Sequence, residues 1–324
     1  MVGDVKRIGI LTSGGDAPGM NAAIRGAVRC GISHGCEMIG IEGGYCGLMD
    51  GVMREMNLRS VSDIISKGGT VLRTARSKEF STKEGLMRAK NMAEIFRLDA
   101  LIVIGGDGSF RGAKDLSEMG IKVMGIPATI DNDIGCTDYT IGYDTALNTV
   151  KDAIDKIKDT AYSHERCSIV EVMGRDAGYI ALNTAIADGA EVAVLPEKDF
   201  DLNNDVIIPI INCRNRGKKD YIIVVAEGAA DSMVLAEQIK EKLNIKPTVS
   251  ILGYIQRGGS PTVRDRVTAS LMAVKAVDML CNGEYNKVMA QKGDKIVAFD
   301  IAEALKMKKC IDPDMIEAMQ ILSL

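Results

Sequence analysis

Short apolar runs alternate with amphipathic stretches along most of this chain. Residues 101–104 and 123–126 are apolar almost throughout, which is typical of strands that are buried on both faces of a parallel sheet. Similar runs predict further strands at residues 7–11, 37–42, 168–173, 192–195, 221–226 and 248–252.

Amphipathic segments between these runs predict helices. In residues 143–158 apolar side chains recur at helical spacing, at Tyr143, Ala146, Leu147, Val150, Ile154 and Ile157. Further helices are predicted at residues 20–34, 83–97 and 110–119. Strands that alternate with helices predict an α/β fold with largely parallel sheets. The length of 324 residues favours two domains, with a boundary near residue 140, before the long helix.

Acidic residues follow two of the predicted strands. Asp107 lies in GGDGS at residues 105–109, and Asp131 and Asp133 lie in PATIDND at residues 127–133. Open α/β sheets bind their ligands at the carboxyl ends of strands, and the glycines around Asp107 allow a phosphate to approach the backbone. Carboxylates beside a phosphate require a divalent cation between them. The pattern therefore predicts metal-assisted phosphoryl transfer.

Composition narrows the range of functions. The chain has 40 basic and 44 acidic residues, a formal charge of −4, which disfavours nucleic-acid and membrane partners. No apolar run is long enough to span a bilayer. The apolar run after Lys6 and Arg7 is too short for a signal peptide and is predicted to be the first strand. The chain is expected to be cytoplasmic.

Cysteine and histidine contribute little to the predicted chemistry. The eight cysteines show no paired CxxC spacing and no histidine-rich companion, so a zinc site or disulfide framework is not expected, and the thiols are expected to be reduced. The two histidines are His34 and His164, and His164 is interpreted as a structural or surface residue rather than a catalytic base.

Several glycine turns carry arginines, and each also has a simpler structural interpretation. The turn at residues 12–21 can present backbone N–H groups to an anion, or it can be an ordinary βα turn. Arg73 and Arg76 follow Gly68 and Gly69, where they can hold a phosphate or lie in a solvated loop. Spacing alone leaves the roles of the arginines open.

Taken together, five motifs resemble the bacterial ATP-dependent 6-phosphofructokinase family, the phosphofructokinase A family. They are TSGGDAPGMNAAIRG, IGGDGS, TIDND, EVMGR and GYIQRGGSP, and the similarity extends from Arg7 to about Asp278. The resemblance implies two Rossmann-like α/β domains with mainly parallel sheets, the phosphofructokinase fold. Residues 1–140 plus about 256–305 would bind ATP and Mg²⁺, and residues 141–255 plus about 306–324 would bind the sugar phosphate. It further implies phosphorylation of fructose 6-phosphate at its 1-hydroxyl by ATP, which gives fructose 1,6-bisphosphate and ADP in glycolysis, by a homotetramer.

The resemblance also implies site residues. Asp131 would accept the proton of the sugar hydroxyl, and Asp107 would bind magnesium. Asp133 would support the magnesium ion and the cluster of carboxylates. Thr129 and Arg175 would lie near the transferred phosphoryl group. Implied ATP contacts are Gly15, Arg76, Ser77, Gly106, Asp107, Gly108 and Ser109. Implied sugar-phosphate contacts are Thr129, Asp131, Arg166, Met173, Gly174, Arg175, Glu227, Thr248, Tyr254 and Arg257. A nucleotide or phosphoenolpyruvate effector would be bound by Arg25, Arg29, Lys158, Glu191, Arg216, Lys218 and Lys219.

The chain departs from the family pattern at the donor side and at the acceptor side. Ala128 replaces the usual glycine before TIDND, where pyrophosphate-using relatives carry lysine, but Gly108 retains the glycine that those relatives replace by aspartate. Thr248 replaces an arginine that reaches the sugar phosphate of a neighbouring subunit, and Tyr254 replaces a histidine. Lys246, two residues before Thr248, is predicted to compensate; without compensation, sugar-phosphate binding is expected to be weak.

Three alternatives remain open at this point. Pyrophosphate could replace ATP as donor, another phosphorylated ketose could replace the acceptor, or the chain could be a catalytically silent regulatory paralogue. The three retained carboxylates, Asp107, Asp131 and Asp133, favour an enzyme over the last of these. A dehydrogenase is disfavoured because no dinucleotide fingerprint is present.

Overall fold

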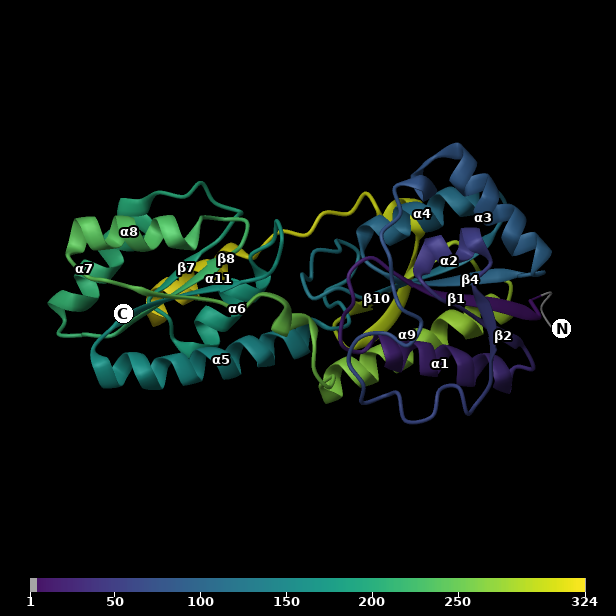
Figure 1. Cartoon of the computed structure of the whole chain (residues 1–324), viewed down its shortest axis with the longest axis horizontal. Coiled ribbons are helices and arrows are strands. Elements are labelled where there is room, and N and C mark those ends of the chain that lie inside the picture. Colours follow the sequence, from purple (N-terminus) through teal and green to yellow (C-terminus); the bar gives the residue numbers. More distant parts are fainter. Residues whose placement is uncertain (1–4, 324) are drawn as a thin grey trace. The chain divides into compact units, whose positions relative to one another are not determined.

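A computed structural model describes residues 5–323 of the chain, and these form two compact units (Figure 1). The first contains residues up to 145 together with residues 257–309, and the second contains residues 146–256 together with the remainder from residue 310. The chain thus leaves the first unit, builds most of the second, returns to the first and ends in the second.

In the described residues of the first unit, seven strands form one sheet in the order β11-β10-β5-β4-β1-β2-β3. The strands are β1 (Arg7–Ser13), β2 (Glu37–Ile41), β3 (Met53–Met56), β4 (Ala100–Gly105), β5 (Lys122–Pro127), β10 (Lys287–Lys292) and β11 (Lys295–Asp300). The inner strands pair in parallel, whereas β3 and β11 pair antiparallel at the two edges. Every residue of β4 is buried, which explains its continuous apolar sequence.

Helices cover both faces of this sheet. In Figure 1, α1 (Met20–Ser33) and α9 (Val263–Cys281) lie side by side on one face, and α2 (Gly44–Asp50), α3 (Lys83–Ile95) and α4 (Asp107–Glu118) lie on the other. The short helix α10 (Ile301–Ala304) packs near α4. The backbones of α1 and α9 approach closely, because a Cβ atom on Gly26 would lie only 3.1 Å from the carbonyl oxygen of Ser270.

In the described residues of the second unit, four parallel strands form a sheet in the order β7-β8-β6-β9. They are β6 (Cys167–Val172), β7 (Val192–Val194), β8 (Tyr221–Ala226) and β9 (Thr248–Ile251). Helix α8 (Ser232–Leu243) lies on one face, and α5 (Tyr143–His164) and α6 (Tyr179–Asp188) lie on the other (Figure 1). The remaining helices are α7 (Ile208–Asn215) and α11 (Pro313–Leu322), and α11 packs against α6.

The predicted α/β class with mainly parallel sheets is confirmed, and every predicted strand and helix is present, β8 with the predicted ends and the others with ends that differ. Helix α5 continues to His164, beyond the predicted end at residue 158, and α4 begins at Asp107 rather than residue 110. Strands β3, β10 and β11 were not predicted. β3 and β11 are edge strands, which keep exposed positions and lack a continuous apolar run, and β10 has only a short apolar stretch between polar residues. Helices α2, α7, α8, α9, α10 and α11 were not predicted. In α9 many of the buried residues are small, such as Ala269 and Ala273, which weakens the apolar pattern.

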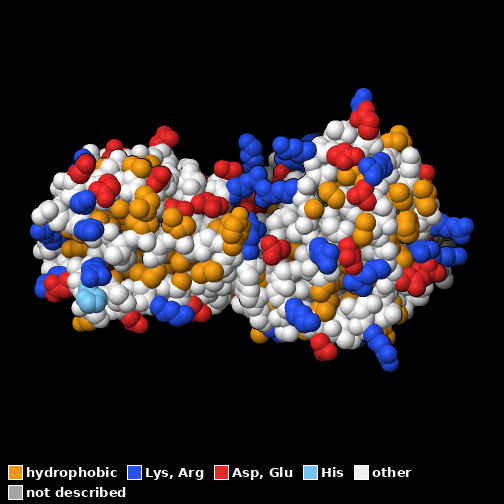
Figure 2. Space-filling model, in the orientation of Figure 1, with side chains coloured by type: hydrophobic (Ala, Val, Ile, Leu, Met, Phe, Trp, Pro, Cys, Tyr) orange, Lys and Arg blue, Asp and Glu red, His pale blue; other side chains and the backbone are white. Residues whose placement is uncertain are grey.

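On the face seen in Figure 2, each unit carries both acidic and basic side chains, and the formal charge of the chain is −4. No helix in the described part of the chain combines the length and apolar character that crossing a bilayer requires.

Candidate functional site

Three strands of the first sheet end at the same edge, and their following loops carry the predicted site residues. In the strand register, Ser13 at the end of β1 pairs with Gly105 of β4, and Gly105 pairs with Pro127 of β5. The TSGGD turn, the GGDGS segment and the PATIDND segment therefore begin side by side. This placement follows from parallel pairing of strands of matched length.

The loop after β5 holds Asp131 in a defined position. Asn132 adopts a left-handed backbone conformation with φ of 53°, and its side-chain oxygen accepts a hydrogen bond from the backbone N–H of Thr140 at 3.2 Å. The Thr140 hydroxyl donates to the carbonyl of Thr129 at 2.7 Å. Thr129 and Asp131 are both buried, and the Asp131 N–H donates to Thr129 Oγ1. The loop is therefore rigid before any ligand binds.

A lysine from the end of the first unit lies beside this acidic loop. Lys309 Nζ donates to the carbonyl oxygen of Asp138 at 2.9 Å. Burial lowers the pKa of Lys309 to about 8, while the carboxylates of Asp138 and Asp133 favour its charged form. This cation offsets part of the negative charge around Asp133.

Asp107 is the first residue of helix α4, directly after Gly106. Its Oδ2 accepts a hydrogen bond from Arg111 Nε at 2.8 Å, and 42% of the side chain is exposed. Arg111 was not predicted; its only sequence signal is its position four residues after an acid on a helix. Asp107 is thus partly exposed to solvent and is paired with the exposed Arg111.

The two residues after Asp107 differ in their surroundings. Gly108 is exposed, and a Cβ atom built on it would have no neighbour within 4 Å. Ser109 is buried, and its hydroxyl donates to the carbonyl of Ser13 at 3.0 Å. Gly108 therefore leaves open space at this edge, while Ser109 fastens the segment to the end of β1.

The TSGGD turn is held against a second glycine loop by Asn21, whose role was not predicted. The Asn21 side chain donates to the carbonyl of Lys67 at 3.0 Å and accepts from the N–H of Val71 at 2.8 Å. These bonds place the loop that carries Arg73 and Arg76 beside the turn. Asn21 is the last residue of TSGGDAPGMN, so its motif position was the available signal.

Arg257 also lies at this turn. Its Nη1 donates to the carbonyl of Asp16 at 3.2 Å, and a Cβ atom on Gly15 would lie 2.5 Å from the same nitrogen. A side chain at position 15 would therefore displace the guanidinium from this place against the backbone. The resemblance predicts that Arg257 contacts the sugar phosphate. In the structure, Arg257 borders the turn that is predicted to bind ATP.

Arg76 and Ser77 complete the predicted ATP-side set. Arg76 is exposed, so its guanidinium is accessible to a phosphate group. The Ser77 hydroxyl accepts a hydrogen bond from the N–H of Phe80 at 3.1 Å, at the short helix η1 (Glu79–Ser81). Ser77 therefore has a local structural role in addition to the predicted one.

In the second unit, most predicted sugar-phosphate residues gather at the carboxyl edge of the sheet. Glu227 Oε1 accepts hydrogen bonds from the N–H groups of Arg175 at 2.8 Å and Gly174 at 3.3 Å. The side chain of Gln256, which is fully buried, accepts from the N–H of Met173 at 3.1 Å. The Arg175 side chain is exposed, and so is that of Tyr254 in η3 (Gly253–Arg257). Glu227 and Gln256 thus fix a loop that presents Arg175 to solvent.

Arg166 and Thr248 lie at the opposite edge of the same sheet. Arg166 directly precedes β6, and Thr248 begins β9, where it pairs with Ser168 in the register. The Thr248 and Ser168 hydroxyls lie 3.0 Å apart. Because the six residues of β6 span roughly 20 Å, Arg166 and Arg175 cannot contact one phosphate within a single chain.

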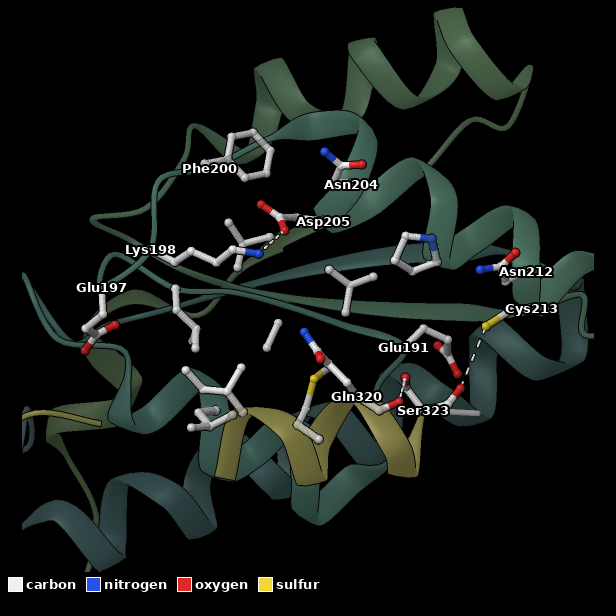
Figure 3. A pocket seen from close by; sticks show the side chains of 18 of the residues that line it. Glu191, Glu197, Lys198, Phe200, Asn204, Asp205, Asn212, Cys213, Gln320 and Ser323 are labelled. Carbon is white, nitrogen blue, oxygen red and sulfur yellow. Dashed lines mark hydrogen bonds and ion pairs between the residues drawn. The ribbon is translucent and has the colours of Figure 1, made fainter. Parts of the chain in front are cut away.

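The predicted effector residues are only partly brought together. Glu191 is buried, forms an ion pair with Lys218 and accepts from the N–H of Ile222 at 2.6 Å. Glu191 and Arg216 line a cavity of about 290 Å³ bounded by β7, η2 (Asn203–Ile207), α7 and α11 (Figure 3).

The other predicted effector residues lie elsewhere in the described structure. Lys158 donates to the carbonyl of Asp188, and Lys219 pairs with Glu165 at 2.7 Å. Arg25 and Arg29 belong to α1 in the first unit. An effector site that used all seven would need groups from outside the second unit.

The acidic residues of the first unit fit a magnesium ion. Mg²⁺ is bound through one or two carboxylates and keeps several water molecules. Asp107 is partly exposed, so its carboxylate has access to solvent and to hydrated ions. Asp131 and Asp133 lie on the neighbouring loop of the same edge. The donor set consists of hard oxygen atoms, as this ion prefers.

Parallel α/β units of this kind, with glycine turns and carboxylates at the carboxyl edge of a sheet, define a phosphate-binding α/β protein. A family model described as "Phosphofructokinase" matches residues 7–280. The chain belongs to the phosphofructokinase family.

Similar proteins agree with this assignment. The chain is 51% identical over 99% of its length to the whole of a protein named ATP-dependent 6-phosphofructokinase from Alkaliphilus metalliredigens. It is also 52% identical to a protein of that name from Halalkalibacterium halodurans, over 99% of this chain and 100% of the relative. Among solved structures, phosphofructokinase from Pichia pastoris in the T-state superimposes with a TM-score of 0.89 and 32% identity over 98% of this chain. The chain spans 39% of that longer subunit.

A more distant structure shows the fold alone. Pyrophosphate-dependent phosphofructokinase from Marinobacter aquaeolei superimposes with a TM-score of 0.86 over 98% of this chain and 91% of that one, at 21% identity. The same fold thus occurs in a protein named for the other donor, and donor choice must be argued from the site.

Proposed function

We propose that this chain is an ATP-dependent 6-phosphofructokinase of glycolysis. It transfers the terminal phosphoryl group of ATP to the 1-hydroxyl of fructose 6-phosphate and releases fructose 1,6-bisphosphate and ADP. The observation that carries the proposal is the buried, backbone-fixed position of Asp131 after β5, in a chain that matches relatives of this name over their full length.

Asp131 is the base in this proposal. Phosphoryl transfer depends mainly on position and on neutralised charge, with one carboxylate to take the proton of the attacking hydroxyl. The rigid loop between Thr129 and Thr140 keeps the carboxylate in place, so little reorganisation accompanies the reaction. Thr129, on the same loop, orients the transferred group, and Asp133 supports the charge arrangement.

Magnesium would be held by Asp107, with Asp133 nearby. When bound, the ion neutralises the negative charge of the ATP phosphates. The chain's own residues then hold the nucleotide: the Gly15 turn and the N-terminus of α4 offer backbone N–H groups, and Arg76 offers a guanidinium.

The donor site favours ATP over pyrophosphate. Gly108 leaves open space at the start of α4, where a larger acidic side chain would exclude and repel a nucleotide phosphate. Ala128 is buried, and its N–H donates to the carbonyl of Gly105 at 3.0 Å. Its methyl group therefore points into the protein fold rather than adding a charged group to the site.

On the acceptor side, one chain contributes Arg175 and the loop held by Glu227, which bind the sugar. Met173 and Tyr254 lie at the same edge. Arg166 lies at the other end of the sheet and would reach the sugar phosphate of a second copy, beside Thr248, which holds the position of the family's second arginine. This division supports the homotetramer that the family resemblance implies, with each acceptor site completed by a neighbour.

Regulation and location belong to the same proposal. Glu191, Arg216 and Lys218 in the second unit provide charged groups for a nucleotide or phosphoenolpyruvate effector, completed by residues such as Arg25 from elsewhere. As a glycolytic enzyme the chain would act in the cytoplasm.

The proposal is tested by steady-state phosphorylation of fructose 6-phosphate with magnesium, run in parallel with ATP and with pyrophosphate. Turnover with ATP alone is expected. Turnover with pyrophosphate alone would reassign the donor. The absence of turnover with either donor would overturn the proposal and point to another acceptor or to a regulatory paralogue.

A further inference from the structure

The C-terminal ends of two neighbouring helices carry a cluster of thiol, imidazole and carboxylate groups outside the site described above. Cys30 and His34 lie four residues apart at the end of α1, and Asp278 and Cys281 lie three residues apart at the end of α9. Such spacings place side chains on one face of a helix. Because α1 and α9 pack side by side (Figure 1), the two pairs face each other.

Three donor atoms of this cluster already lie at ligand spacing. Cys30 Sγ is 3.4 Å and His34 Nε2 is 2.8 Å from Asp278 Oδ1. All three atoms lie within 4.8 Å of one another. A tetrahedral zinc ion with bonds of roughly 2.0–2.3 Å requires ligand atoms separated by roughly 3.3–3.8 Å. Side-chain adjustments of less than about 1 Å would therefore close the site around an ion.

The surroundings provide access and a water ligand. Cys30 is buried, Asp278 is partly exposed and His34 is exposed, so an ion can enter from solvent and retain a water molecule. Cys281, one helical turn after Asp278, contacts Cys36 instead, with the two Sγ atoms 3.9 Å apart.

The helix backbones favour a cation at this position. Helix α1 ends at Ser33 and α9 ends at Cys281, so the carbonyl ends of both helices point toward the cluster. Helix C-termini carry a partial negative charge. The Cys30 thiol also contacts the carbonyl oxygen of Val274 at 3.7 Å. Both backbone and side chains thus concentrate negative potential at one point.

We propose that Cys30, His34 and Asp278 form a binding site for a borderline-soft divalent cation, with Zn²⁺ as the ion whose preferences match these donors, and that the ion clips α1 to α9. Thiolate and imidazole ligands select Zn²⁺ over Mg²⁺, which prefers oxygen. Binding releases the thiol proton of Cys30 and replaces the hydrogen bond between His34 and Asp278. The site is independent of the proposed phosphoryl-transfer chemistry.

Sequence spacing alone gave no indication of this site and led to the opposite expectation. The ligands come from segments 244 to 248 residues apart, and neither half contains CxxC. Each half is an ordinary pair of residues on a helix, and only the packing of α1 against α9 brings them together.

The test uses the full chain, kept reduced with a thiol-free phosphine and stripped of metals by a chelator, in excess Mg²⁺. Co²⁺ is the spectroscopic probe, because a cobalt–thiolate bond gives a charge-transfer absorption that oxygen ligands do not, and competition by Zn²⁺ then gives its affinity. We expect one equivalent of Co²⁺ with thiolate absorption, displaced by Zn²⁺. The midpoint of thermal unfolding should also rise when Zn²⁺ is added.

Matched variants locate the site. Because changes even to residues beyond the ligands cost roughly 10–100-fold in affinity, His34→Ala should weaken Zn²⁺ binding by at least about 100-fold and abolish the thermal shift. His34 is exposed, so this variant should fold. Cys30→Ser should remove the thiolate absorption. His164→Ala and Cys310→Ser, which change an exposed histidine and an exposed cysteine elsewhere, should bind as the unchanged chain does.

Either of two results would overturn the proposal. One is the absence of thiolate absorption and of Zn²⁺ binding in the unchanged chain. The other is absorption and affinity that persist in both Cys30→Ser and His34→Ala, which would assign the metal to other thiols such as Cys36 and Cys281.

Discussion

The two units use the edges of their sheets differently. In the first unit, the predicted residues around Asp107 and Asp131 lie at the carboxyl edge of one sheet, on loops that follow paired strands. In the second unit, Arg175 lies at the carboxyl edge, while Arg166 and Thr248 lie at the opposite edge. The first unit therefore gathers its predicted acidic residues at one edge, whereas the second divides its predicted arginines between two edges.

This difference has a physical basis in charge. Carboxylates that share a metal must lie close together, so they are held on neighbouring loops of a rigid sheet. Arginines that bind a phosphate can come from separate chains, because each contributes its own charge-assisted hydrogen bond. The comparison therefore separates variants that abolish turnover from variants that weaken acceptor binding.

The largest effect is expected for Asp131→Asn. Removal of the base should lower kcat by about 10²- to 10⁴-fold and leave the KM for ATP nearly unchanged, as measured by steady-state kinetics. Asp138→Asn is the matched control, since Asp138 is an exposed acid seven residues after Asp131 that pairs with Lys292 of β10. A kcat for Asp131→Asn near that of the unchanged chain would show that another group takes the proton.

Arg166→Ala should act on acceptor binding instead. Loss of a charge-assisted hydrogen bond costs about 1.5–3 kcal/mol, so the KM for fructose 6-phosphate should rise roughly ten- to a hundredfold. Co-expression of Arg166→Ala with Asp131→Asn should restore part of the activity, because a mixed oligomer can combine the intact Asp131 of one chain with the intact Arg166 of another. Absence of any recovery would count against a shared acceptor site.

Gly108→Asp is expected to have a smaller effect, confined to the donor. Gly108 is exposed, so the repulsion between a carboxylate and a phosphate is partly screened, and kcat/KM for ATP should fall by about tenfold without loss of folding, because the position is open. Gly108→Ala is the control for size without charge. Equal ATP kinetics in the aspartate and unchanged chains would remove Gly108 as a determinant of the donor.

The smallest effect is expected for Lys246→Ala. Lys246 is exposed, and a solvent-exposed charge contributes about 0.2–1 kcal/mol, so the KM for fructose 6-phosphate should rise roughly two- to fivefold. Lys242→Ala, an exposed lysine on α8, serves as the control. An unchanged KM in Lys246→Ala would refute its compensation for the arginine that Thr248 replaces.

Much of the fold was predictable because its signals are local. The buried inner strands β4 and β5 have continuous apolar runs, and α5 has helical periodicity, so each was found from a short window of residues. Edge strand β11 and the alanine-rich face of α9 were not found, because exposed positions and small side chains weaken that pattern.

The candidate site likewise contains residues that the sequence could identify and residues that it could not. Asp107, Asp131 and Asp133 lie within contiguous motifs directly after strands, so the sequence identified them as a group. Positioning residues such as Asn21 and Gln256 act through bonds to distant loops, and spacing could not show which loops they would hold.

The sequence by itself determined the family, the parallel α/β class and the acidic loops, because each depends on residues that are neighbours along the chain. Only the tertiary structure decided that Arg166 and Arg175 occupy opposite edges of one sheet and that Cys30, His34 and Asp278 meet at the ends of two helices. Those arrangements depend on strand register and helix packing, which bring together residues that no short segment contains.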